Sequence, residues 1–301
     1  MKSREHRGIF TIDEVLPYLG AEPDLQVDSL GGGLWTVSDG RSRALFAEGA
    51  TSVVAFDTLG TPGAARAYRK AIASTLPGKP VATVIYSHDH LDHCGYGADF
   101  APEAEVIADE MAAKVIAVRK AEGQLPVTRV MRGERNPVEI DGVSFQLLNP
   151  GPTHGTGNMA AYFPQRKLLF MVDTILPNAR YGLLPDYHIG NFVRFMRSLL
   201  ELDFEVFVPG RYQVSDRPGF IRGCDYIEAI QQATQQAFVE MVPVWVLEAI
   251  TGYVRERLQG RFGQLEGFSE HVGLSAFRII HHYLMGGWGL EDTPRPGLNL
   301  A

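Results

Sequence analysis

Three histidines and two aspartates lie together where residues 87–93 read Ser-His-Asp-His-Leu-Asp-His. Imidazole and carboxylate groups are borderline ligands that suit zinc, and also iron or manganese in the right geometry. On an extended chain His88 and His90 are two residues apart and project to the same side. Asp92 and His93 then fall in the following turn, where they can address a second position nearby. The pattern therefore predicts a metal site for one or two ions.

A buried strand over 81–86 is predicted to end directly before this cluster. In open α/β sheets ligand sites gather at the carboxyl ends of the strands, because the loops leave the sheet there. Short apolar runs bounded by turn residues predict the strands, and helical spacing with caps predicts the helices. The predicted strands are 34–37, 44–47, 52–56, 81–86, 105–108, 143–148, 159–163, 168–172 and 206–208. The predicted helices begin at Pro62 and end before Gly78, run from a cap at Asp109 to Lys120, and cover 192–202.

The character of the chain changes from about Pro218 onward. Residues 224–258 and 269–284 have helical character and no strand-like alternation, and no linker or internal repeat separates them from the rest. We therefore predict an α/β catalytic domain over 1–217 and a helical extension over 218–301. The extension is expected to pack on the same domain, as a lid or as a dimerisation element.

Composition excludes several classes of function. The chain has 301 residues and a net charge of −7, whereas a nucleic-acid binder needs a basic surface. No apolar run reaches the length of a bilayer span, and no apolar segment of a secretory signal follows the N-terminal charges. Two cysteines, Cys94 and Cys224, are too few for a disulfide framework. We expect a cytoplasmic protein with a small-molecule substrate, no nucleic-acid or membrane partner, and a homodimer as one option.

The histidine cluster resembles the signature of the metallo-β-lactamase superfamily, whose members have an αββα sandwich and a mono- or dinuclear metal site. Three other segments are similar to that family in the same order along the chain. They are VVAFDTLG at 53–60, NPGPTHGTGNMAAYFP at 149–164 and FMVDTI at 170–175. The resemblance covers approximately residues 34 to 212 and implies a metal-dependent hydrolase.

The resemblance also implies a role for single residues. One metal ion would be bound by His88, His90 and His154. A second would be bound by Asp92, His93 and Asp173, with Asp173 bridging the two ions. Asp57 would orient the histidine loop from behind. The implied cofactor is zinc, as one or two ions, with iron or manganese as alternatives.

The sequence departs from the family pattern at Arg211. The family usually has a histidine after the strand here, but this chain reads Pro209-Gly210-Arg211. Arginine presents only donors and cannot replace a metal ligand. Either the second site is weak or empty, or another histidine such as His188 substitutes, or the guanidinium occupies the region and clamps an anionic group of the substrate. A solvent-exposed charge at a strand end is the plainer alternative for Arg211, and an ordinary loop histidine is the plainer alternative for His188.

The expected chemistry is hydrolysis. A metal ion lowers the pKa of its bound water towards neutrality and so supplies hydroxide. The bond attacked is expected to be an ester, thioester, lactone or related bond of a small molecule. Asp92 is the expected proton carrier, because it can reach both the nucleophile and the leaving group. Arg211 is expected to stabilise the negative charge that develops.

Two other functions stay open on the sequence alone. An iron-dependent oxidoreductase can use the same scaffold, and the identity of the metal would distinguish it. A non-catalytic relative could hold a ligand at the altered second site without converting it. Turnover of generic ester and thioester substrates would separate that class from an enzyme.

Overall fold

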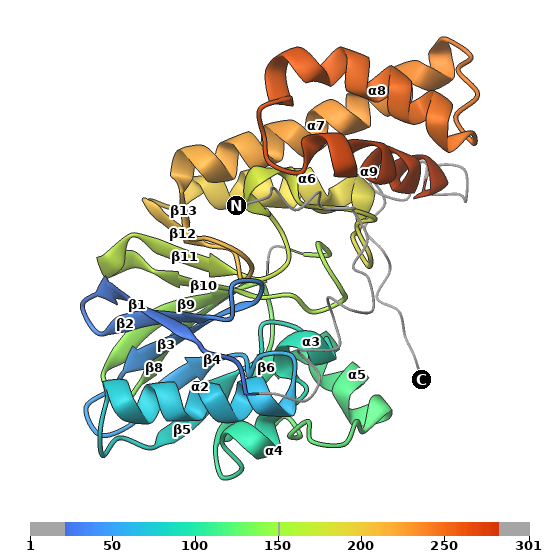
Figure 1. Cartoon of the computed structure of the whole chain (residues 1–301). Helices are drawn as coiled ribbons and strands as arrows, with labels where there is room; N and C mark the ends of the chain where they lie inside the picture. Colours follow the sequence, from blue (N-terminus) through green and yellow to red (C-terminus); the bar gives the residue numbers. More distant parts are fainter. Residues whose placement is uncertain (1–21, 150, 283–301) are drawn as a thin grey trace.

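Two β-sheets face each other, and helices cover the outer face of each (Figure 1). This computed structural model describes residues 22–149 and 151–282 of the chain. The four layers form the αββα sandwich that the sequence predicted, and further helices extend it beyond the second sheet. In the described ranges no helix is both long and apolar enough to cross a membrane.

The first sheet combines an antiparallel half with a parallel half. Its seven strands follow the order of the sequence, from β1 to β7. Neighbours from β1 to β4 pair antiparallel, whereas β4, β5, β6 and β7 pair parallel. The bounds are β1 Gln26–Gly31, β2 Leu34–Ser38, β3 Arg43–Glu48, β4 Val53–Phe56, β5 Val81–Ile85, β6 Glu105–Asp109 and β7 Arg129–Met131.

The second sheet has six strands in the order β13-β12-β11-β10-β9-β8. Its pairs are antiparallel, except that β11 and β12 are parallel. The bounds are β8 Arg135–Ile140, β9 Val143–Leu148, β10 Ala160–Phe163, β11 Leu168–Met171, β12 Val206–Val208 and β13 Ser215–Asp216.

The helices connect the strands and then form the extension. The helices in the connections between strands of the first sheet are α2 Pro62–Thr75, α3 Leu91–Cys94, α4 Gly97–Phe100 and α5 Glu110–Arg119. Those associated with the second sheet are α6 Ile189–Ser198, α7 Arg217–Val239, α8 Leu247–Phe262 and α9 Phe268–His282. Single 3₁₀ turns are η1 Pro164–Arg166, η2 Pro177–Ala179 and η3 Leu199–Glu201.

Alternation along the strands divides the apolar side chains between two faces. In β4, Val54 and Phe56 point between the sheets, whereas Val53 and Ala55 pack towards α2. Between the sheets, the Phe56 ring meets the edges of Phe145, Phe163 and Phe170 at centroid distances of 5.6–5.8 Å. This interior is continuous, so it fixes the strand ends of the two sheets relative to each other.

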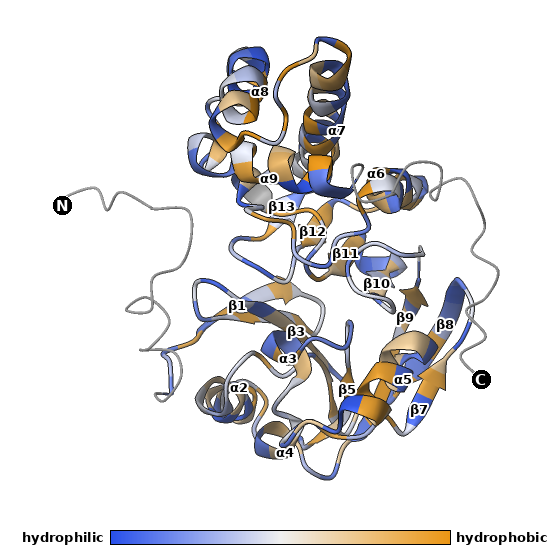
Figure 2. Ribbon diagram, turned by 90° about the vertical axis from the view of Figure 1, so that its right-hand side faces the viewer, coloured by the Kyte–Doolittle hydropathy of each residue, from blue (hydrophilic) through white to orange (hydrophobic). Residues whose placement is uncertain are grey.

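The helical extension packs on the outer face of the second sheet. Buried residues of β10, β11 and β12 form one apolar cluster with residues from α6, α7, α8 and α9. Along α7 and α8, hydrophobic and hydrophilic segments alternate, as expected of helices that bury one face (Figure 2). The division of the chain at residues 217 and 218 stays a prediction, and residues 1–21 and 283–301 of the two predicted units lie outside the described part.

The predicted helix over 224–258 is wrong in one respect, because the chain forms two helices there. α7 ends at Val239 and α8 begins at Leu247. Met241 between them has a left-handed backbone with φ of 56°. Pro243 follows, and a proline has no N–H to continue the helical hydrogen bonds. The predicted end of the last helix, at 284, lies outside the described residues.

Candidate metal centre

The SHDHLDH segment leaves β5 and turns at once into the short helix α3. His88 lies in a bend three residues after the end of β5, and His90 is the residue that precedes α3. The backbone carbonyl of His90 accepts hydrogen bonds from the N–H groups of His93 and Cys94, at 3.2 and 3.0 Å. The Cys94 thiol donates to the His88 and His90 carbonyls, at 2.8 and 3.0 Å. The cysteine is therefore a buried anchor of the histidine loop.

Asp57 fixes His88 through Ser87. Asp57 follows β4, and its carboxylate accepts the Ser87 N–H at 2.7 Å and the Ser87 hydroxyl at 2.8 Å. Because that hydroxyl has one proton, its 2.8 Å contact with Nδ1 of His88 is a bond donated by the imidazole. Nε2 of His88 then carries the lone pair, and it is buried with no hydrogen-bond partner. Burial raises the pKa of Asp57 to about 6, although His93 and the Ser87 bonds oppose this.

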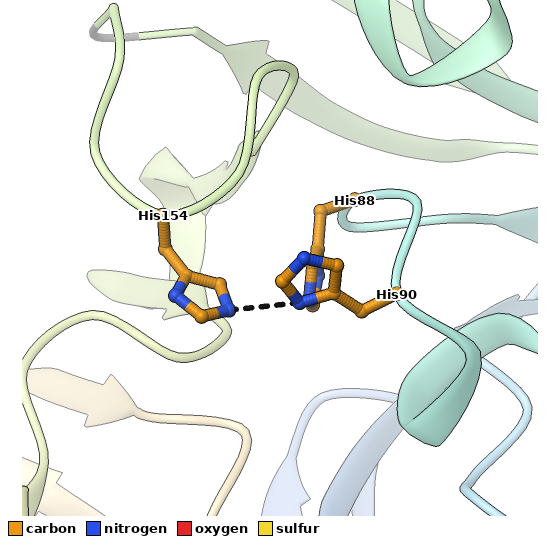
Figure 3. A group of neighbouring side chains, drawn as sticks. All are labelled: His88, His90 and His154. Carbon is orange, nitrogen blue, oxygen red and sulfur yellow. Dashed lines mark hydrogen bonds between the residues drawn. The ribbon is translucent and has the colours of Figure 1, made fainter. Parts of the chain in front are cut away.

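The other two histidines of the first group face each other across the site. Nε2 of His90 is bonded to Asp186 at 2.8 Å, so its Nδ1 is the atom that faces the site. Nδ1 lies 3.0 Å from Nε2 of His154 (Figure 3). Two nitrogens bound to one tetrahedral zinc ion at 2.0–2.1 Å lie about 3.3 Å apart. The pair is therefore close to the spacing that a shared metal requires.

His154 is held by two loops that pair with each other. Residues 153–155, between β9 and β10, exchange backbone hydrogen bonds with residues 186–188, and His154 forms an isolated bridge with Tyr187. The Tyr187 ring packs 4.8 Å from the imidazole of His154. Burial lowers the pKa of His154 to about 4. The imidazole is therefore neutral at pH 7, the form in which histidine binds metals.

The first group fits a metal ion. One nitrogen from each of His88, His90 and His154 lies within 4.8 Å of the others. In this arrangement the buried Nε2 of His88 is satisfied only if a ligand or an ion comes to it. Three imidazoles are a ligand set typical of zinc.

The second predicted group also comes together. Asp92, His93 and Asp173 each bring one ligand atom to within 4.8 Å of the others. Asp173 follows β11, and its Oδ2 lies 3.2 Å from Nε2 of His93 and 3.6 Å from Nε2 of His154. Both ring nitrogens of His93 are buried without a hydrogen bond of good geometry. Burial raises the pKa of Asp173, but Arg211 and His93 lower it more, so the carboxylate is ionised.

The guanidinium of Arg211 is hydrogen-bonded to the two carboxylates of this second group. Its Nη2 donates to Oδ2 of Asp173 at 2.7 Å and also to Asp92, while its Nε donates to the other oxygen of Asp173. The sequence left several positions open for Arg211. In the structure its guanidinium occupies the region of the second metal ion, between Asp92 and Asp173. His188 belongs to neither group and instead precedes α6.

Sequence reasoning missed Asp186, which orients His90. It lies on the loop after η2 with a left-handed backbone, and its side chain is 55% exposed. Asp89 and Arg119 were missed as well. The Arg119 guanidinium contacts the Asp89 carboxylate at 3.1 Å and the Asp89 carbonyl, and so ties α5 to the histidine loop. The only sequence signal for Asp186 was its place two residues before His188. The spacing of Asp89 and Arg119 along the chain gave no indication that they form a pair.

A comparison with protein families decides the relationship of this chain. The model of the metallo-beta-lactamase superfamily matches residues 38–211, which include both groups of candidate ligands and Arg211. The chain belongs to the metallo-β-lactamase superfamily. This confirms the resemblance and the fold, and it makes the two His/Asp groups candidates for the metal centre of a metallo-β-lactamase-fold protein.

Several known superfamily proteins are similar to almost the whole chain. The chain is 42% identical over 289 residues to 2,4-dinitroanisole O-demethylase subunit alpha of Nocardioides sp. (strain JS1661), covering 95% of this chain and 88% of that protein. It is 38% identical over 272 residues to subunit beta from the same strain, covering 90% and 85%. The solved sec-alkylsulfatase Pisa1 from Pseudomonas sp. has a TM-score of 0.67 at 16% identity, over 92% of this chain and 52% of that one. A match of that extent reaches into the helical extension.

Replacing Asp186 should weaken metal binding by the first group. In Asp186→Asn the residue still tolerates the left-handed backbone, but the carboxylate that holds His90 loses its charge. We expect a loss of about 10-fold or more in affinity, as for other carboxylates that orient a ligand histidine. Competition with a chromophoric chelator measures the affinity. Asp203→Asn, at a residue whose side chain is 76% exposed, is the control, and equal affinities in the two variants would contradict the role of Asp186.

Proposed function

We propose that this chain is a metal-dependent hydrolase of small molecules and that its substrates are electron-poor aryl methyl ethers. The observation that carries the proposal is the three-histidine group, in which one ring nitrogen of each histidine converges with the others near the end of β5. The substrate class is supported by similarity over nearly the full chain to two proteins named as O-demethylase subunits. We propose zinc as the metal, because three neutral imidazoles suit it.

The reaction that fits this site consumes water and needs no oxidant. When bound, the metal supplies ionised water at neutral pH. The ether and one water give a phenol and methanol: the bond from the methyl carbon to the phenolic oxygen breaks, and a bond from the methyl carbon to the water oxygen forms. Negative charge develops on the phenolic oxygen, and an electron-poor ring stabilises it. Arg211 holds a permanent positive charge beside the site and stabilises the same charge further.

The protein groups have separate tasks in this proposal. Asp57, through Ser87, and Asp186 fix the two histidines that follow β5. Asp92, whose side chain is 54% exposed, is the proposed acceptor of the proton from water. The thiol of Cys94 and the Arg119–Asp89 pair keep the loop in place.

The products distinguish hydrolysis from oxidation. We expect the metal-loaded protein to convert 2,4-dinitroanisole into 2,4-dinitrophenol and methanol in equal amounts, also in the absence of oxygen. Absorbance of the phenolate and gas chromatography of methanol measure the two products. Formaldehyde in place of methanol, or a need for oxygen and a reductant, would replace the hydrolase with an oxidoreductase. Protein treated with a chelator serves as the control and should be inactive.

Replacing Asp92 should remove catalysis but leave the fold intact. In Asp92→Asn the side chain keeps its size and cannot accept the proton, so turnover should fall by about 100- to 10,000-fold. Initial rates with the same ether measure this loss, and metal content and melting temperature check that the first group and the fold remain. Turnover equal to that of Asp203→Asn would reject the assignment of Asp92.

We also propose that the working unit contains a second copy of this chain. Both relatives are named as subunits of one enzyme, and each aligns with most of this chain. The turn between α7 and α8 exposes an unusual run of large apolar side chains, here called the α7–α8 patch. Its members, with their exposed fractions, are Val239 74%, Met241 87%, Trp245 67%, Val246 42% and Leu247 41%. Such a patch is typical of a protein–protein contact.

Light scattering after size exclusion tests this assembly. We expect a dimer for the natural sequence and a monomer for the double variant Met241→Ser, Trp245→Ser, because the apolar contact is lost. Leu183→Ser is the matched control, since Leu183 is 49% exposed but lies outside the α7–α8 patch. A monomer for the natural sequence at micromolar concentration, or a dimer for the double variant, would reject the contact.

A further inference from the structure

We propose that the guanidinium of Arg211 is a fixed cation in the place of a second metal ion, so that this chain binds one ion. That ion is the one at His88, His90 and His154, so the inference rests on the metal site of the proposed function. It does not depend on which substrate the chain converts.

The carboxylates that a second ion needs are already bound. Arg211 donates from Nε and Nη2 to the two oxygens of Asp173, which is the forked geometry of a bidentate pair, and from Nη2 to Asp92. The Arg211 side chain is 16% exposed and that of Asp173 is 8% exposed. Opposite charges attract more strongly in such surroundings than in water. A divalent ion would have to break these bonds and then lie beside the displaced positive charge.

The backbone holds Arg211 at this position. Gly210 before it has a left-handed backbone with φ of 72°, and a Cβ there would lie 2.7 Å from Val172. The Gly210 carbonyl accepts the Arg43 N–H at 2.7 Å, and Arg211 itself forms a bridge with Ser42. These contacts hold the backbone of Arg211 against both sheets. Its side chain therefore reaches the two aspartates from a fixed position.

Among the residues that the structure describes, no fourth His, Cys, Asp or Glu ligand joins Asp92, His93 and Asp173. Arginine has no lone pair to give to a metal, and His188 is not part of either ligand group. The second group then offers Asp92, His93 and Asp173, with both carboxylates neutralised in part by Arg211. Within 22–149 and 151–282, the hydrogen bonds of Arg211 use Nε and Nη2 and leave Nη1 for a bound molecule. Arg211 thus supplies charge where a second ion would, and adds directed N–H donors.

Metal counting tests the inference without any activity assay. The natural sequence and Arg211→His are purified with zinc, freed of loosely bound ions and analysed by inductively coupled plasma mass spectrometry. We expect one ion per chain for the natural sequence and two for Arg211→His, because the imidazole frees two carboxylates and adds a ligand. Arg69→His, on an exposed position of α2, is the control for a histidine added elsewhere and should keep one ion.

The outcomes separate this inference from the proposed function. Two ions in the natural sequence, or one ion in a folded Arg211→His, would overturn the fixed-cation role while leaving a metal enzyme. No ion in the natural sequence would overturn both proposals.

A second variant keeps the test decisive if Arg211→His does not fold. His154→Ala removes one ligand of the three-histidine site, so it should lose the only ion and contain none. A full ion retained in that variant would reveal a second site and contradict the inference. Cobalt titration of the metal-free natural protein gives an independent count, with visible absorption expected to saturate at one equivalent.

Discussion

Buried imidazole nitrogens without a hydrogen-bond partner are the constraint around which the rest of this molecule is arranged. Nε2 of His88 and both nitrogens of His93 are shielded from water and unsatisfied, a cost that a fold tolerates when a ligand compensates it. The donor chain from His88 through Ser87 to Asp57 assigns the tautomer that leaves Nε2 free. Burial, the loop anchors and the apolar interior together hold the His88 and His93 rings in place beside the other candidate ligands.

The sequence predicted the interior of the fold better than its borders. Every predicted strand exists, and those over 143–148 and 206–208 have the predicted ends. The four strands that were missed, β1, β7, β8 and β13, are the four edge strands of the two sheets. Edge strands are partly exposed and lack a buried run: β1 has no buried residue, and β8 contains Pro137. A method that follows apolar alternation cannot find them.

The candidate site divides in a similar way. All six predicted ligands come together in two groups, because strand ends and a dense motif place them. The partners that orient them were harder to find. Asp186 is 96 residues from His90, and the contact between them depends on how loops 153–155 and 186–188 pair. Where the guanidinium of Arg211 lies was left open for the same reason, since spacing along the chain does not fix the direction of a long side chain.

The three-histidine group draws its members from both halves of the sandwich. His88 and His90 follow β5 of the first sheet, whereas His154 lies between β9 and β10 of the second. An ion held by all three histidines would cross-link the two sheets. Such linkage adds about 4 kcal/mol to the free energy of unfolding when the free ion exceeds its dissociation constant a thousandfold. With the proposed ion bound, the cohesion of the sandwich would therefore depend on metal supply as well as on apolar packing.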